Sequence, residues 1–247
     1  MLFGSTYLNG VAIPSSSISS ALAHYVTNLA LFNDDPVFRI SLRGSATPLR
    51  IKDRFLLACC RHQLDGYDLE KVGLLSRDGK VLVTSAGVRH FVHHTESDFS
   101  DLVVFDFTAP CLEHTSLQDR FFHLTEIPPG APSIETMFLQ VAGYPYNDQK
   151  YELEEKNHLG LVKRKVICDL APPPADDALQ RLKPAERLTF EPDGMSGASA
   201  FTVQWVSGKP TAYFAGMVVR AGREDLYILK SGYIQAVMQT FVSDVTP

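Results

Sequence analysis

The sequence predicts an all-β protein with a helix at each end. Short apolar runs separated by turn residues are the pattern of a β-barrel or a β-sandwich. These runs form two sets, each about 90 residues long, on either side of a proline-rich connector. Helical spacing of apolar residues occurs near the two ends of the chain. With 247 residues, 45% of them hydrophobic and 21% charged, the chain can form one large domain or two small ones around a substantial core.

Residues 1–36 are predicted to be a helical extension. After Pro14 and three serines, apolar residues recur at spacings of three and four, namely at Ile18, Leu22, Tyr25, Val26 and Leu29. Residues 33–36 are expected to end this helix. The pattern leaves two positions open for it, against the main domain or against a regulatory partner.

The first β set is predicted to cover residues 37–125. From Val37 the apolar pattern has a period of two until Gly44 and Ser45 interrupt it, which predicts a strand with one buried face. Further strands are expected in this set at 55–59, 72–75, 81–84, 91–92 and 102–107.

The second β set is predicted to cover residues 126–230, and a C-terminal helix is predicted at 231–247. Strands are expected in this set at 138–142, 160–167, 200–206, 211–219 and 226–229. The helix is indicated by an apolar stripe at Tyr233, Ile234, Val237, Met238, Phe241 and Val242.

Charge and composition exclude several classes of partner. The net charge is −5 and there is no long basic run, so no nucleic-acid partner is expected. No uncharged apolar run reaches membrane-spanning length, and the N-terminus lacks the basic start of a secretory signal, so no membrane partner is expected. The cysteines, Cys59, Cys60, Cys111 and Cys168, show no metal-site spacing. We therefore expect reduced thiols, a cytoplasmic location, and no metal or cofactor.

A small-residue turn at 193–200 is the candidate for chemistry. Ser196 lies there between Gly194 and Gly197, and an apolar strand follows at once. Such a turn can expose a serine hydroxyl while its N–H groups point at a developing oxyanion, which suits acyl transfer. The alternative is an ordinary Gly/Ser hairpin turn.

A serine nucleophile also needs a base and a group that orients the base. His62 follows one predicted strand and Asp101 precedes another, so the three residues occur in the order His, Asp, Ser. Asp98 is the rival orienting carboxylate, and Asp101 is preferred because a strand follows it directly. Ser199 is the rival nucleophile, but it lacks the flanking glycines.

Three histidines, His90, His93 and His94, form a cluster that could hint at a metal site. No matching cysteine or acidic constellation accompanies them, so a polar surface turn is expected instead.

Three segments together resemble the chymotrypsin-fold (trypsin-like) serine proteases, in particular bacterial and viral members without disulfides. Residues 194–198, Gly-Met-Ser-Gly-Ala, resemble the family's G-D-S-G-G. Residues 57–62, Leu-Ala-Cys-Cys-Arg-His, resemble its L-T-A-A-H, and residues 101–105 resemble its D-I-A-L-L. The resemblance covers roughly residues 37–243, with the motifs in the family's order and at its usual spacing.

The resemblance implies two antiparallel six-stranded β-barrels with the site between them. It implies a serine endopeptidase acting on a protein or peptide substrate, with Ser196 as nucleophile, His62 as general base and Asp101 orienting the base. The amides of Gly194 and Ser196 would form the oxyanion hole. Substrate would lie along Val219, Arg220 and Ala221. The alternative is a catalytically silent module of the same fold that binds a peptide or protein partner.

Three departures from the family pattern change these expectations. Met195 stands where zymogen-activated members have an aspartate, so activation by a new N-terminus is not expected. Gln63 stands where a cysteine often follows the histidine, so that disulfide is absent. Phe190 takes the place of the pocket-floor residue, which implies an apolar or blocked pocket and no preference for Lys or Arg.

Overall fold

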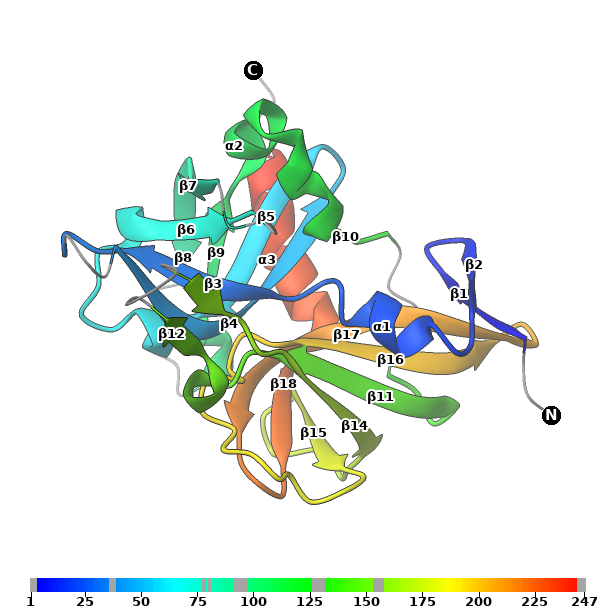
Figure 1. Cartoon of the computed structure of the whole chain (residues 1–247). Coiled ribbons are helices and arrows are strands. Elements are labelled where there is room, and N and C mark those ends of the chain that lie inside the picture. Colours follow the sequence, from blue (N-terminus) through cyan, green and yellow to red (C-terminus); the bar gives the residue numbers. More distant parts are fainter. Residues whose placement is uncertain are drawn as a thin grey trace.

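The chain folds into two large β-sheets, and a C-terminal helix packs against strands of both (Figure 1). The computed structural model describes residues 4–35, 39–76, 79, 81–90, 97–125, 132–152 and 158–243.

The C-terminal half is a closed six-stranded barrel. Its strands are β11 (Thr136–Gly143), β14 (Arg164–Leu170), β15 (Leu179–Pro184), β16 (Ser199–Val206), β17 (Lys209–Ala221) and β18 (Leu226–Lys230). They follow the order β16-β11-β14-β15-β18-β17, and β17 pairs again with β16 to close the barrel. A hairpin of β1 (Ser5–Leu8) and β2 (Val11–Pro14) extends this sheet, with β1 parallel to β17.

The N-terminal half is a half-barrel. Its strands are β3 (Thr27–Phe32), β4 (Ile40–Ile51), β5 (Arg54–Cys60), β6 (Val72–Leu75), β7 (Leu82–Thr84), β8 (Gly87–His90), β9 (Leu102–Asp106) and β10 (Phe122–His123). The order is β7-β6-β3-β4-β5-β9-β8, with β10 beside β4. Among the described strands, β7 and β8 have no partner on their outer sides, so this sheet stays open. A separate two-stranded sheet joins β12 (Lys150–Glu152) to β13 (His158–Gly160).

The helices are short except at the C-terminus. The α-helices are α1 (Ile18–Leu22), α2 (Thr108–Glu113) and α3 (Ser231–Ser243), and the 3-10 turns are η1 (Arg61–Leu64), η2 (Leu69–Lys71), η3 (Asp98–Asp101), η4 (Thr115–Arg120) and η5 (Tyr146–Asp148). In the part of the chain that the structure describes, none of the helices has the length and apolar character needed to cross a bilayer.

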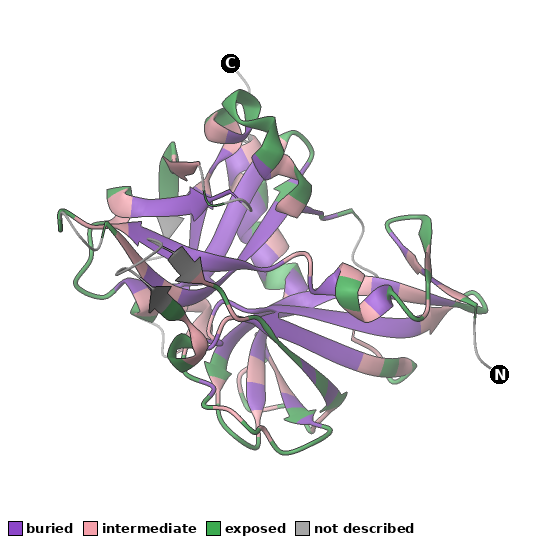
Figure 2. Ribbon diagram, viewed as in Figure 1, coloured by how far each residue is buried: buried purple, intermediate pink, exposed green. Residues whose placement is uncertain are grey.

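A shared core joins the two halves. Leu49 and Leu56 of the first sheet, Phe201 and Phe214 of the second, and Met238 of α3 belong to one buried cluster. Figure 2 shows this buried layer running through the central strands, with exposure confined mainly to loops and strand ends. Because one continuous core joins both halves and α3, the two sheets hold a fixed relation to each other.

The predicted all-β class with a C-terminal helix is confirmed, with one closed six-stranded barrel, while the first of the two expected barrels is a half-barrel. The predicted N-terminal helix is wrong in extent, because it ends at Leu22 and residues 27–32 form the buried strand β3. A short buried apolar run has no periodicity that separates strand from helix. Gly44 and Ser45 do not end a strand but lie inside β4, where Gly44 takes a φ of +96°. The predicted strand at 91–92 lies outside the described residues.

Candidate active site

His62 and Asp101 are brought together by the pairing of β5 with β9. Cys60 at the end of β5 lies opposite Leu102 at the start of β9, so η1 and η3 are adjacent. The His62 Nδ1 atom lies 2.7 Å from Asp101 Oδ2, and the His62 main-chain N–H donates to Oδ1 at 3.0 Å. The hydrogen bond to the carboxylate raises the pKa of His62, because it stabilises the imidazolium. Both ring orientation and tautomer are therefore fixed by Asp101.

The turn that carries Ser196 requires glycine at two positions. Gly194 has a φ of +89° and Gly197 a φ of +84°, which L-residues with side chains rarely adopt. A Cβ on Gly197 would lie 2.0 Å from the main-chain oxygen of Ser45. The glycines therefore allow the turn to press directly against β4 of the other half.

The main-chain amides of Gly194 and Ser196 both point away from the protein's own acceptors. The carbonyl of Asp193 accepts from Tyr146 N–H at 2.6 Å, and that of Met195 accepts from Ala198 N–H at 2.9 Å. In a trans peptide the N–H points opposite to the C=O, so pinning these two carbonyls aims the N–H groups of Gly194 and Ser196 the other way. Among the described residues, neither N–H has a hydrogen-bond acceptor. They form a preorganised pair of donors suited to an oxyanion.

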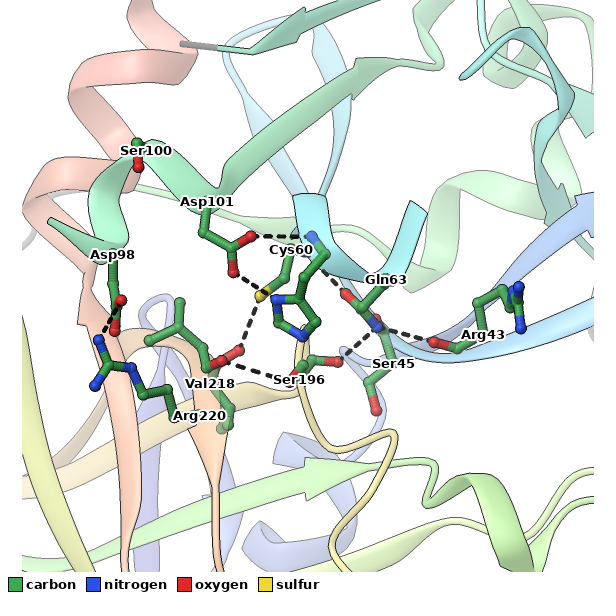
Figure 3. A network of polar contacts seen from close by, with 12 residues as sticks. Arg43, Ser45, Cys60, Gln63, Asp98, Ser100, Asp101, Ser196, Val218 and Arg220 are labelled. Atoms are coloured by element: carbon green, nitrogen blue, oxygen red, sulfur yellow. Dashed lines mark hydrogen bonds and ion pairs between the residues drawn. The ribbon is translucent and has the colours of Figure 1, made fainter. Parts of the chain in front are cut away.

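The Ser196 hydroxyl is not bonded to the imidazole in this state. Its Oγ donates to the main-chain oxygen of Val219 at 3.4 Å, and no hydrogen bond joins it to His62. Figure 3 shows Ser196 beside Gln63 and Val218, with Asp101 on the far side of the network. The hydroxyl must turn about its Cα–Cβ bond before His62 can take its proton, and such contacts often tighten only when substrate binds.

Gln63 connects the base to the nucleophile. Its Oε1 accepts from Cys60 N–H at 2.9 Å, and its Nε2 lies within hydrogen-bond distance of three carbonyl oxygens: those of Arg43 (3.0 Å), Ser45 (3.1 Å) and Ser196 (2.9 Å). One side-chain amide thus joins the end of β5, strand β4 and the nucleophile turn (Figure 3). Gln63 thus links these segments by hydrogen bonds at a position where proteins of the resembled family often have a disulfide.

Strand β4 supports the same turn from the first half of the chain. Ser45 Oγ donates to the Gly194 carbonyl at 2.8 Å and accepts from Tyr144 N–H at 2.8 Å. Thr47 Oγ1 donates to the Gly197 carbonyl at 2.8 Å. These side chains hold the turn by its carbonyls and leave its outward amides untouched.

The predicted substrate strand has a free edge. On one edge β17 pairs with β16 as far as Met217 and with the main chain of Gly197 and Ala198 at Val218, whereas β18 covers the opposite edge through Ala221. Within the described strands, the outer edge of β17 at Val219–Ala221 is therefore unpaired beside Ser196. The Arg220 side chain is 62% exposed and pairs with Asp98. An open edge of this kind can pair with an extended peptide.

Phe190 and Met195 pack on the core of the second barrel. Phe190 is partly buried there, and the Arg164 guanidinium lies 5.6 Å from its ring centre. Met195, which stands where the resemblance places an aspartate, is fully buried in the same cluster. As an apolar side chain it needs no charged partner there. That Phe190 lines a specificity pocket stays a prediction.

The rival residues have other contacts. Asp98 pairs with Arg220 rather than with the imidazole. Ser199 is fully buried, and its Oγ bonds to the Tyr25 carbonyl and to Thr47. The His90 side chain, and the whole of His93 and His94, lie outside the described residues.

Cys60 is a further side chain at the site. Its thiol is fully buried, donates to the Val218 carbonyl at 3.4 Å, and has a pKa well above its usual value because of burial and the nearby Asp101. Ligand atoms of Cys60, His62 and Asp101 all lie within 4.8 Å of one another. These three residues could hold a divalent ion such as Zn²⁺ only if the bond between His62 and Asp101 opened.

The fold is that of the chymotrypsin-type proteases. No family profile matches the chain, and no characterised protein sequence is significantly similar to it. Among solved structures, human heparin binding protein is similar with a TM-score of 0.55 and 10% identity, covering 91% of this chain and 93% of that one. The Vibrio cholerae VesB protease is similar with a TM-score of 0.52 and 9% identity, covering 91% of this chain and 65% of that one. At these identities the likeness establishes the fold alone.

Proposed function

We propose that this chain is a serine endopeptidase that cleaves peptide bonds through an acyl-enzyme intermediate. The observation that carries the proposal is that two independent features of a catalytic site occur together. One is an imidazole oriented by a carboxylate, and the other is a serine whose turn presents two unpartnered N–H groups among the described residues. Acyl transfer needs both, and a structural turn needs neither.

The mechanism follows from the contacts. An extended peptide pairs with the free edge of β17 and brings its carbonyl carbon to Ser196. The Ser196 hydroxyl turns from Val219 to His62 Nε2, which takes its proton while Asp101 stabilises the imidazolium. The N–H groups of Gly194 and Ser196 donate hydrogen bonds to the carbonyl oxygen and stabilise the negative charge that develops on it. His62 then protonates the leaving amine, and water repeats the sequence on the acyl-enzyme.

The test is labelling with a fluorophosphonate probe, which reacts with activated serines. We expect wild-type protein to be labelled, and Ser196→Ala and His62→Ala to remain unlabelled. Ser199→Ala, which alters the buried rival, serves as the folded control and should still be labelled. Labelling that persists in Ser196→Ala would assign the nucleophile elsewhere.

The alternative is a peptide-binding module without activity. It is favoured by one observation, the Ser196 hydroxyl bonded to Val219 instead of His62. Absence of labelling in folded wild-type protein, also after addition of candidate partners, would support this alternative. We also propose a reducing, cytoplasmic location, to which the four buried free thiols are suited.

A further inference from the structure

Arg43 differs from three arginines of the second half that are ion-paired. Arg220 pairs with Asp98, Arg223 with Glu191 and Arg164 with Asp148. Arg43 forms no ion pair with any described residue, and its Nε is buried without a hydrogen-bond partner. The residue as a whole is only half-buried, and its two outer guanidinium nitrogens are not among the buried atoms, so these nitrogens can receive a carboxylate from outside the chain.

The position of Arg43 assigns it to one side of the cut. The main-chain oxygens of Arg43 and Ser196 both lie within hydrogen-bond distance of Gln63 Nε2, so Arg43 is a close neighbour of the nucleophile. Figure 3 shows Arg220 and Arg43 at opposite ends of the network, with Ser196 between them. In the proposed function the residues before the cut lie along β17 past Arg220, so the chain after the cut leaves toward Arg43.

The guanidinium of Arg43 is also held in place. Its Cζ lies 3.8 Å from the ring centre of Tyr67, in a stacked cation–π contact. The Gln63 hydrogen bond fixes its main chain. A charge that is already positioned loses little conformational entropy when it binds a partner.

We propose that Arg43 selects substrates with Asp or Glu at the first or second residue after the scissile bond. This proposal rests on the proposed peptidase function, because it refers to a bond that is cut. The contact between Arg43 and an acidic residue needs only a bound peptide. Arg61, which is exposed beside Tyr67, shares its hollow with Asp65, so these two charges offset each other. The guanidinium of Arg43 itself disfavours Lys and Arg at the same substrate positions.

The experiment is cleavage-site profiling on a peptide library by mass spectrometry, followed by peptide pairs that differ only as Glu or Gln after the cut. We expect wild-type protein to favour Glu over Gln by about five- to tenfold, with the preference falling as salt rises. Arg43→Gln should abolish the preference, and Arg43→Glu should reverse it toward Lys and Arg. The control is Arg50→Gln, because Arg50 is also on β4 and stacked on an aromatic ring, Phe55, but away from the site. It should keep the wild-type preference.

Two outcomes would overturn the proposal. One is wild-type cleavage without acidic enrichment after the cut. The other is enrichment that survives in Arg43→Gln.

If wild-type protein neither cleaves nor takes the probe, the peptidase function fails, and selection of library peptides on immobilised Ser196→Ala protein tests the contact separately. Acidic peptides should then be enriched by Ser196→Ala and not by the Ser196→Ala, Arg43→Gln double variant. Equal recovery from both would reject the role of Arg43.

Discussion

The two halves of the molecule contribute to the site by different means. The half-barrel supplies side chains: His62 and Asp101 bond to each other, and Gln63 bonds to main-chain groups of β4, β5 and the nucleophile turn. The closed barrel supplies the Ser196 hydroxyl and two main-chain donors, the amides of Gly194 and Ser196, held by hydrogen bonds to the carbonyls that precede them. In the closed barrel a turn pinned by main-chain hydrogen bonds holds fixed donors, whereas in the half-barrel the pairing of β5 with β9 brings together the side chains that move a proton.

The largest expected effect is that of Asp101→Asn, which removes the carboxylate that orients His62 in the half-barrel. The variant places an amide against His62 Nδ1, favours the wrong tautomer and should lower kcat by about 10³–10⁴-fold. Because the carboxylate raises the pKa of His62, wild-type activity should rise with pH through that raised pKa. The residual activity of the variant should rise through a lower one. The measurement is a pH profile of kcat/KM.

Asp98→Asn is the control for this variant, since Asp98 lies on the same turn but pairs with Arg220. Asp98→Asn should lower the pKa of His62, seen as the acidic midpoint of the pH profile of kcat/KM, much less than Asp101→Asn does. Equal shifts in the two variants would mean that general charge, and not the hydrogen bond, sets the pKa of His62.

The nucleophile side is broken by Gly197→Ala. Alanine would have to adopt the φ of +84° found at this position, and its Cβ would lie 2.0 Å from the Ser45 main-chain oxygen. Strand β4 and the turn must therefore separate. We expect a loss of at least about 3 kcal/mol in the free energy of unfolding, measured with urea. Gly208→Ala is matched, because Gly208 has a φ of +78° with nothing within 4 Å of a Cβ, and should cost about 1 kcal/mol. Equal losses would show that backbone strain, and not the contact with β4, makes Gly197 necessary.

The link between the halves is tested by Gln63→Leu. This variant leaves Cys60 N–H and the Ser196 carbonyl without their partner, and misplacement of the nucleophile should lower kcat by about 10–100-fold with KM little changed. Gln149→Leu removes a comparable amide that bonds to Pro145 and Val162 on a loop of the second barrel. Both variants should lose a similar amount of stability, measured by urea unfolding. A fall in kcat as large in Gln149→Leu would reduce Gln63 to a structural residue.

The sequence predicts the ends of this network better than its middle. His62, Asp101 and Ser196 each have a local signature, because strand ends and a Gly-Ser turn can be recognised within a few residues. The contacts of Ser45 and Thr47 with the turn span 149 and 150 positions, and no local pattern links such distant residues. The identity of Gln63 was visible beside His62, but its four hydrogen-bond partners were not.

The fold shows the same division. Alternating and apolar runs place most strands of both halves, but β3 has the pattern of a buried helix segment and β15 carries too many polar residues to stand out. The short α1 is tied to the second barrel, where Gln140 Nε2 donates to the Ser19 carbonyl at 2.8 Å. Deleting residues 1–33 would remove β3 from the first sheet, so that deletion cannot separate a regulatory role of this segment from folding. A regulatory partner at the N-terminal helix therefore stays a prediction.

The smallest expected effect concerns how easily each half opens. Cys111 in the first half and Cys168 in the second are both fully buried, and burial raises the pKa of each thiol to about 12. Neither should react with iodoacetamide in the folded protein at pH 8, because the thiolate is the reactive form and is both scarce and inaccessible. Cys111 lies on α2, which packs on β5 of the open sheet, and Cys168 lies on β14 of the closed barrel. At urea concentrations below the main transition, local opening should expose α2 and the open sheet before the closed barrel. We therefore expect Cys111 to be alkylated a few times faster than Cys168, measured by peptide mass spectrometry. Alkylation of Cys168 first would mean that closure of the barrel does not make the second half the more rigid support.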